Sequence, residues 1–222
     1  MAGTRPGLSC STSLDTWCSA LLIVFEGIDG SGKTTQARSL FRRLTRLELQ
    51  AILIHEPGGT PLGEAVRRWV KTGQSLNPQT ELFLFSAART QLVADVIRPA
   101  LSDGVIVIAD RFVASTVAYQ GYGRGIDRTL IAEVNREATA EIEPDLTLLL
   151  DAEPEICTKR TTERSNSGSD NFDTAPLEFH RRVRQGYLEQ ARIDRDRWAI
   201  LDAGASKVQL SREIWAKVQP LL

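Results

Sequence analysis

Residues 27–34 read GIDGSGKT and satisfy the pattern G-x-x-x-x-G-K-[ST]. The stretch closely follows the apolar run 21–25 and opens a helical pattern at 33–48. Glycines let successive backbone N–H groups converge on an anion, and the amino end of the helix adds its own partial positive charge. The segment therefore predicts a phosphate-binding loop between a strand and a helix, and this prediction decides the fold.

Two side chains in this loop are of the types that nucleotide phosphates require. Lys33 is placed to neutralise the β- and γ-phosphates, and the Thr34 hydroxyl is placed to ligate Mg²⁺. A Gly-rich turn before an amphipathic helix is the alternative, but it leaves Lys and Thr at these positions to coincidence. The loop indicates ATP or GTP and does not identify the reaction. The predicted ATP-binding residues are Gly27, Ile28, Asp29, Gly30, Ser31, Gly32, Lys33, Thr34 and Thr35.

Short β-branched runs alternate with longer amphipathic stretches along the rest of the chain, which is the pattern of successive βα units. The runs are apolar almost throughout, as strands covered on both faces should be. We expect strands at 21–25, 51–55, 105–109, 146–150 and 198–201, and helices at 33–48, 62–71, 78–101, 128–141, 153–163, 176–194 and 206–218. The predicted fold class is α/β, a three-layer α/β/α P-loop NTPase fold with a five-stranded parallel sheet and a helical lid.

The expected domain organisation is simple. Residues 1–20 are rich in Ser, Thr and Gly and read as a flexible extension, with a short organelle-targeting segment as the alternative. Residues 21–222 are expected to form a single P-loop domain. A lid is expected at about 160–175, because the Ser-rich stretch at 165–170 has no apolar residue with which to pack.

Composition excludes several classes of partner. The chain has 27 Lys and Arg against 28 Asp and Glu, so it lacks the basic surface that nucleic acids or anionic membranes usually select. Its apolar runs fall far short of the roughly 20 residues that span a bilayer. The 3 cysteines have no metal-binding or disulfide spacing, which fits a reducing compartment. We therefore expect a cytoplasmic protein with no nucleic-acid and no membrane partner.

Four segments carry a resemblance to a known family. They are FEGIDGSGKTTQ at 25–36, HEPGGTPLGE at 55–64, DRFVASTVAYQGYGRG at 110–125 and FHRRVRQGYLE at 179–189. In order and separation they resemble the thymidylate kinase family, over nearly everything from residue 22 onward. The resemblance implies transfer of the γ-phosphoryl group of ATP to dTMP, with Mg²⁺, to give dTDP and ADP for dTTP synthesis. It also implies a homodimer.

Asp110 and Arg111 follow the predicted strand 105–109, where the loops of a parallel sheet gather around its ligands. A carboxylate there can orient the hydration shell of Mg²⁺, and an arginine can bind the acceptor phosphate or the transferred group with two donors. The alternative is a surface ion pair. The family's D-R-[YF] motif implies that both residues act in catalysis, together with Lys33, and that Asp110 joins Thr34 in metal binding.

The resemblance also implies the contacts of the acceptor nucleotide. Phe85 and Arg89 lie four residues apart on one helix face, the ring stacking on thymine and the arginine donating to its O4 carbonyl. Thr116 and Gln120 meet the pyrimidine edge, and Tyr119 lies against the sugar. The remaining predicted substrate-binding residues are Arg67 and Arg111 at the phosphate, Asp29 near the 3′-hydroxyl, and Glu56, which lies near sugar and metal or instead pairs with an arginine.

The predicted lid differs from the family pattern. Gly30 and Ser31 carry no charge, so a catalytic cation over the ATP phosphates is expected from Arg160 and Arg164. Asn171 stands where the lid often reads Asp-Arg, which removes another candidate. Two further departures are His55 in place of Arg and Leu92 in place of His.

Two other functions remain open on the sequence. The nearest is another P-loop nucleotide or nucleoside kinase, acting for example on dUMP or a purine monophosphate. The second is a non-catalytic P-loop nucleotide-binding switch, which needs no acceptor site. The segments around Phe85, Arg89 and 110–125 argue against the switch.

Overall fold

A computed structural model describes residues 20–72, 76–164 and 175–222. Nearly all of the expected extension, and residues 165–174 of the expected lid with Asn171, lie outside the described residues. The side chain of Arg164 is also outside the description. The division into extension, domain and lid therefore stays a prediction.

The sheet agrees with the prediction in number, place and direction of its strands. Its strands are parallel throughout and lie in the order β2-β3-β1-β4-β5, with β1 in the middle. The direction in which successive strands are added to the sheet reverses at β1. The crevice at the carboxyl end of β1 is therefore the place where such sheets bind ligands. The bounds are β1 Leu22–Glu26, β2 Ala51–His55, β3 Ile106–Asp110, β4 Leu146–Asp151 and β5 Trp198–Asp202.

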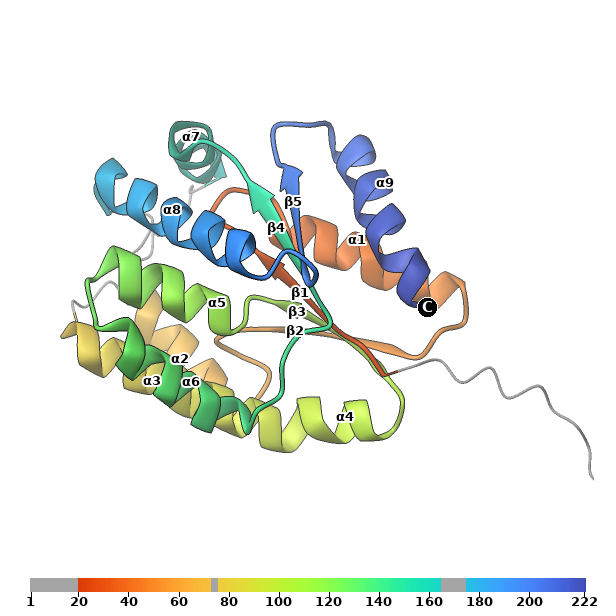
Figure 1. Ribbon diagram of the computed structural model, residues 1–222, viewed down its shortest axis with the longest axis horizontal. Coiled ribbons are helices and arrows are strands. Elements are labelled where there is room, and N and C mark those ends of the chain that lie inside the picture. The colour runs from red at the N-terminus through yellow and green to blue at the C-terminus, as the bar shows by residue number, and fades with distance from the viewer. Residues whose placement is uncertain (1–19, 73–75, 165–174) are drawn as a thin grey trace, which may run out of the picture.

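Helices pack on both sides of this sheet. Figure 1 shows α1 and α9 on one side and α4, α5 and α8 on the other, which gives the three layers that the sequence predicts. The bounds are α1 Lys33–Arg46, α2 Pro61–Lys71, α3 Pro78–Leu92, η1 Val93–Ile97, α4 Arg98–Ser102, α5 Val113–Thr116, η2 Val117–Gly123, α6 Arg128–Thr139, α7 Pro154–Arg164, α8 Leu177–Ile193, α9 Lys207–Val218 and η3 Gln219–Leu221.

The prediction that the strands are buried on both faces is correct for β1 and wrong for β5. Alternate residues of β1 belong to different core clusters: Ile23 and Phe25 pack with the α1 side, and Leu22 and Val24 with the residues of α3 and η1. A central parallel strand buries both faces in this way. β5 is an edge strand, and Ile200 on it is 50% exposed.

The helical segment at 113–123 is absent from the sequence prediction, as is the short η3 after α9. Residues 113–123 form α5 and continue as the π-helical turn η2, whereas no helix is predicted there because β-branched residues and glycines have low helix propensity. Tertiary packing against α8 stabilises the segment despite this low helix propensity. A methyl group on Gly123 would lie 2.6 Å from the Phe179 ring, and one on Gly186 the same distance from Tyr122, so the glycines permit close helix contact.

Candidate active site

The phosphate loop has a conformation that depends on its glycines. Gly27 has φ +139° and Gly30 has φ +87°, and a Cβ atom on them would lie 2.5 Å from the Leu150 carbonyl oxygen and 2.3 Å from that of Cys157. Side chains are excluded at both positions. The loop can therefore keep its backbone folded tightly around the buried Lys33 ammonium, which donates to the Ile28 carbonyl at 3.0 Å.

Thr34 and Asp110 meet across the central crevice of the sheet. The Thr34 hydroxyl, in the first turn of α1, donates to Asp110 Oδ2 at 2.5 Å, and Asp110 is the last residue of β3. Burial and the nearby Arg111 lower the pKa of Lys33, while Asp29 and Asp110 act in the opposite direction. The loop thus places a cation beside a pair of hard oxygen donors.

Arg111 is the centre of a second group of polar side chains. Its backbone is in the left-handed region at φ +78°, which is uncommon for a residue with a side chain. Its Nη2 donates to Asp29 Oδ1 at 2.6 Å and to the Tyr119 hydroxyl at 3.2 Å, and its Nη1 donates to the hydroxyls of Ser115 at 3.0 Å and Tyr187 at 3.1 Å. Burial acts to raise the pKa of Asp29, but Arg111 and Lys33 hold it well below its usual range.

Arg89 is almost completely buried, with 3% of its surface exposed, and pairs with Glu56. Its Nε and Nη2 donate to Glu56 Oε2 at 2.9 and 2.7 Å, a geometry that gives strong charge-assisted bonds. Its Nη1 donates to Thr116 at 3.0 Å and to Asn135 at 2.9 Å. Pairing with an arginine, one of the two roles considered for Glu56, is present; its position near sugar and metal stays a prediction. A base contact by Arg89 stays a prediction.

A cavity of about 200 Å³ opens where these groups meet. It is lined by residues from the phosphate loop, the ends of β2 and β3, and the helices α2, α3, α5 and η2. The lining includes every residue predicted to bind the acceptor: Asp29, Glu56, Arg67, Phe85, Arg89, Arg111, Thr116, Tyr119 and Gln120. Lys33, Thr34 and Asp110 line it too, as do the two departures His55 and Leu92. The structure thus brings segments separated by up to 91 residues into one concave site.

Other predicted residues lie elsewhere. Gly27, Ile28, Gly30, Ser31 and Gly32 of the phosphate loop, and Thr35 in the first turn of α1, do not line this cavity. Arg160, on α7, donates to the Ala203 carbonyl at 3.0 Å just after β5 and is also outside the cavity. Its expected approach to ATP stays a prediction.

Gln120 is held by a residue that the sequence prediction omits. Its Nε2 donates to Glu81 Oε1 at 2.6 Å, and Arg124 pairs with the same carboxylate at 3.1 Å. A carboxylate only accepts hydrogen bonds, so this contact fixes which end of the Gln120 amide faces Glu81 and which faces away from it. Glu81 is therefore a support for a predicted base contact.

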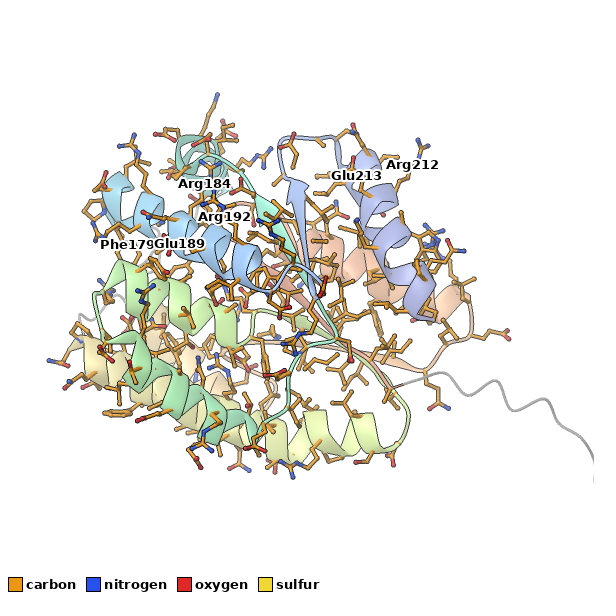
Figure 2. All side chains as sticks on the ribbon, in the orientation of Figure 1. Phe179, Arg184, Glu189, Arg192, Arg212 and Glu213 are labelled. Atoms are coloured by element: carbon orange, nitrogen blue, oxygen red, sulfur yellow. The ribbon has the colours of Figure 1, made fainter. Side chains whose placement is uncertain are left out.

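Further polar residues around Arg111 and Arg89 are also missing from the prediction: Glu26, Ser115, Asn135 and Tyr187. The sequence does contain a signal for Glu26, because it is a charged residue at the end of an otherwise apolar strand. Burial raises the pKa of the Glu26 carboxyl, and Arg111 offsets part of this effect. Ser115 could have been found only with the helix at 113–123 in place. Figure 2 shows α8, which carries Tyr187, with Phe179 and Glu189 labelled; Glu189 accepts from the Tyr122 hydroxyl of η2 at 2.6 Å.

Comparison with known proteins identifies the family. The family model described as thymidylate kinase matches residues 25–214. The chain belongs to the thymidylate kinase family. It is 44% identical to the thymidylate kinase of Thermomicrobium roseum over 200 residues, covering 90% of this chain and 95% of that protein. With the thymidylate kinase of Deinococcus radiodurans it shares 43% identity over 199 residues, covering 89% and 96%.

A solved structure agrees with this assignment. The crystal structure of thymidylate kinase from Ehrlichia chaffeensis superposes with a TM-score of 0.74 at 34% identity, covering 90% of this chain and 99% of that one. The resemblance, the fold class and the enzyme class predicted from the sequence are confirmed: this chain of the thymidylate kinase family is an ATP-dependent nucleoside-monophosphate kinase. Within the part of the chain that the structure describes, no helix is both long and apolar enough to cross a membrane.

Proposed function

We propose that this protein transfers the γ-phosphoryl group of ATP to dTMP and that the cavity beside the phosphate loop holds the dTMP. The observation that carries the proposal is the convergence of the predicted acceptor residues with Lys33, Thr34 and Asp110 on a single cavity. Membership of the thymidylate kinase family supports the same substrates. The product dTDP would then feed dTTP synthesis.

The phosphate loop would hold the ATP phosphates. Its backbone N–H groups and the amino end of α1 provide a site for anions, and Lys33 adds the amino group of its side chain. The base of ATP does not need to enter the acceptor cavity for this arrangement. The loop and the cavity share Asp29, Lys33 and Thr34, so the two nucleotides would meet at this boundary.

The residues present fit a magnesium ion. Thr34 and Asp110 offer a hydroxyl and a carboxylate in contact, which are hard oxygen donors of the kind Mg²⁺ prefers. Residues 20–72, 76–164 and 175–222 contain no cluster of His, Cys, Asp and Glu that could hold a metal by itself. Mg²⁺ usually takes one or two protein ligands plus waters and substrate phosphates, so a small donor set is appropriate. When bound, the ion would neutralise charge on the β- and γ-phosphates.

The acceptor needs orientation more than activation. The phosphate of dTMP is already an anionic nucleophile at neutral pH, so its attack in line with the γ-phosphate requires no deprotonating residue. Arg67 and Arg111 would offset the charge of the two phosphates, and Phe85 would stack on the thymine ring. Tyr119 and Gln120 would complete the pocket at the sugar and the pyrimidine edge.

Closure and assembly belong to the same proposal. Arg160 and Arg164 at the end of α7 would move with a lid over the ATP phosphates. A homodimer is supported by the exposed apolar Phe83 on α3, 54% exposed, and Trp69 on α2, 38% exposed. A cytoplasmic location is supported by the composition of the chain.

A steady-state assay of ADP formation tests the function. Purified protein is given ATP with dTMP, dUMP, dAMP or dCMP, with and without Mg²⁺. We expect ADP formation that depends on both dTMP and Mg²⁺ and has the highest kcat/KM for dTMP. A preference for dAMP or dCMP would contradict the acceptor assignment. ATP binding without acceptor-dependent ADP release would instead support a nucleotide-binding switch.

Replacement of Thr34 by alanine should weaken the use of metal. Loss of the hydroxyl that contacts Asp110 removes one of the two proposed donors. We expect the Mg²⁺ concentration for half-maximal rate to rise by at least about tenfold. Ser39→Ala removes a hydroxyl from the same helix, one that contacts Ser211 instead, and should leave the magnesium titration unchanged. Equal titrations for Thr34→Ala and the wild type would exclude Thr34 as a ligand.

Replacement of Glu81 by alanine should impair acceptor binding. Gln120 loses the contact that orients its amide, so a base contact becomes weaker by about the net value of one hydrogen bond. We expect KM for dTMP to rise about 2- to 10-fold, with kcat at saturating dTMP close to the wild-type value. Glu133→Ala on the exposed face of α6 serves as the control. An unchanged KM for dTMP would show that Glu81 does not act through Gln120.

A further inference from the structure

Glu26 is a buried carboxylate that the proposed transfer step does not use. It ends β1 and has 0% of its surface exposed. Its Oε1 accepts from the backbone N–H groups of Phe112 at 2.9 Å and Ser115 at 3.1 Å, at the start of α5. Its Oε2 accepts from the hydroxyls of Ser115 at 2.7 Å and Tyr187 at 3.0 Å. A carboxylate in such a position is costly unless its partners satisfy it, and here both oxygens are satisfied.

The two hydroxyls on Glu26 also accept from one end of Arg111, which donates to the Gly27 carbonyl as well, at 3.3 Å. Arg111 Nη1 donates to the Ser115 hydroxyl at 3.0 Å and to the Tyr187 hydroxyl at 3.1 Å. The hydroxyl oxygens themselves lie 2.8 Å apart. Glu26, Ser115 and Tyr187 therefore form a closed group of three oxygen-bearing side chains, which we name the Glu26 group. It comes from β1, α5 and α8 and contacts the Nη1 end of the guanidinium; Ser115 also lines the cavity, and Glu26 and Tyr187 do not.

The direction of the hydrogen bonds gives Glu26 its role. A guanidinium only donates, so Ser115 and Tyr187 can hold Arg111 only through their lone pairs. Each hydroxyl proton must then point away from Arg111. Glu26 Oε2 lies within hydrogen-bond distance of both hydroxyls and accepts a hydrogen bond from each. Without it, the hydroxyls can rotate their protons toward Arg111 and lose the contact.

The other end of the guanidinium faces the cavity. Nη2 donates to Asp29 and Tyr119, both of which line the proposed acceptor site. The Glu26 group therefore fixes the rear of Arg111 while its front remains directed at the ligands. The backbone of Arg111 is in the left-handed region at φ +78°, so the surrounding fold, and not local preference, holds its backbone there.

We propose that Glu26, acting through Ser115 and Tyr187, is a positioning residue that holds Arg111 in the orientation required for phosphoryl transfer. The proposal rests on the function proposed above for Arg111. Precise orientation of a charged group matters most in the transition state, where a displacement of about 1 Å can cost on the order of 100-fold in rate. The effect should therefore appear in kcat and much less in KM for ATP.

Tyr187→Phe is the principal test, because it removes one hydroxyl and keeps the ring in the core. We expect kcat to fall between about 10- and 100-fold, with KM for ATP nearly unchanged and the melting temperature close to that of the wild type. Tyr122→Phe is the matched control. It removes a tyrosine hydroxyl that contacts Glu189 and Arg128, none of which lines the cavity, and it should leave kcat unchanged.

A double-mutant cycle separates positioning from a general structural role. If the Tyr187 hydroxyl acts through Arg111, Tyr187→Phe should cost no further kcat in an Arg111→Ala background. If the two losses of kcat multiply in the double variant, the positioning proposal is overturned and the role of Arg111 is not. An Arg111→Ala enzyme that keeps its kcat would overturn the proposal together with the role of Arg111. Formation of ADP that depends on dTMP in the wild type would be unaffected by either result.

Glu26→Gln tests the carboxylate itself. With its amide nitrogen toward the backbone N–H groups of Phe112 and Ser115, the glutamine leaves donors facing donors. With the nitrogen toward the two hydroxyls, it no longer accepts their protons, so these must turn elsewhere and compete with the bonds from Arg111. We expect a fall in kcat similar to that of Tyr187→Phe, measured well below the melting temperature of the variant, and little further loss when the two changes are combined. A lowered melting temperature with an unchanged kcat would overturn the proposal.

Discussion

Arg111→Ala should lower kcat by about 10²- to 10³-fold while the domain stays folded. The expected size is that of removing one positioned donor from a site where charge develops during the reaction. Arg111 reaches into the cavity from the end of β3 and is held there by Asp29, Tyr119, Ser115 and Tyr187. Steady-state rates with ATP and dTMP measure the effect, and circular dichroism checks the fold.

The control for this prediction is an arginine outside the site. Arg197 lies at the amino end of β5, opposite the ligand-binding edge, and pairs with Glu143 and Asp194 on the surface. Arg197→Ala should leave kcat unchanged. A wild-type kcat in Arg111→Ala would contradict the role of Arg111, and a rise in KM for dTMP alone would limit that role to ground-state binding.

Arg89→Ala should lower the free energy of unfolding by about 3–5 kcal/mol. Removing one member of a buried ion pair leaves the other as an uncompensated buried charge, here the carboxylate of Glu56. Thr116 and Asn135 lose a donor as well. Urea unfolding measures the effect. Arg136→Ala is the control, because Arg136 is 59% exposed and its surface pairs with Glu137 and Glu141 should contribute less than about 1 kcal/mol.

The double variant Arg89→Ala, Glu56→Ala separates stability from recognition. It removes both charges, so we expect it to be more stable than Arg89→Ala alone. If Arg89 also binds the base, the double variant should bind dTMP more weakly than the wild type, although it is more stable than Arg89→Ala. A double variant with wild-type KM for dTMP would show that Arg89 stabilises the domain and does not recognise the acceptor. An Arg89→Ala protein as stable as the wild type would contradict the buried pair.

The sequence predicts the parts of the fold and site that depend on local pattern. The residues 27–34 specify a strand, a turn and a helix, and apolar runs place the other strands within one or two residues. The helix at 113–123 is not predictable in this way, because its stability comes from packing on α8 and its residues do not favour helix. Composition and periodicity contain no information on that contact.

Some residues of the candidate site can likewise be predicted from the sequence, and others cannot. Family resemblance supplies Phe85, Arg89 and Arg111, and the structure brings them to one cavity. The partner of Arg89 and the residues behind Arg111 depend on contacts between distant segments. Glu56 and Arg89 are separated by 33 residues, and Glu26 and Tyr187 by 161. Their types alone are compatible with an exposed charge or a core tyrosine, so only the folded chain reveals the pairing.

Transfer of label from [γ-³²P]ATP tests the central claim most directly. Wild-type protein is incubated with labelled ATP, Mg²⁺ and dTMP, and the nucleotides are separated. We expect label in dTDP, formed only when both dTMP and the metal are present. Arg111→Ala should form labelled dTDP at about 10²- to 10³-fold lower rate. Label that appears only in inorganic phosphate, or in the diphosphate of another nucleotide in preference to dTDP, would contradict the central claim.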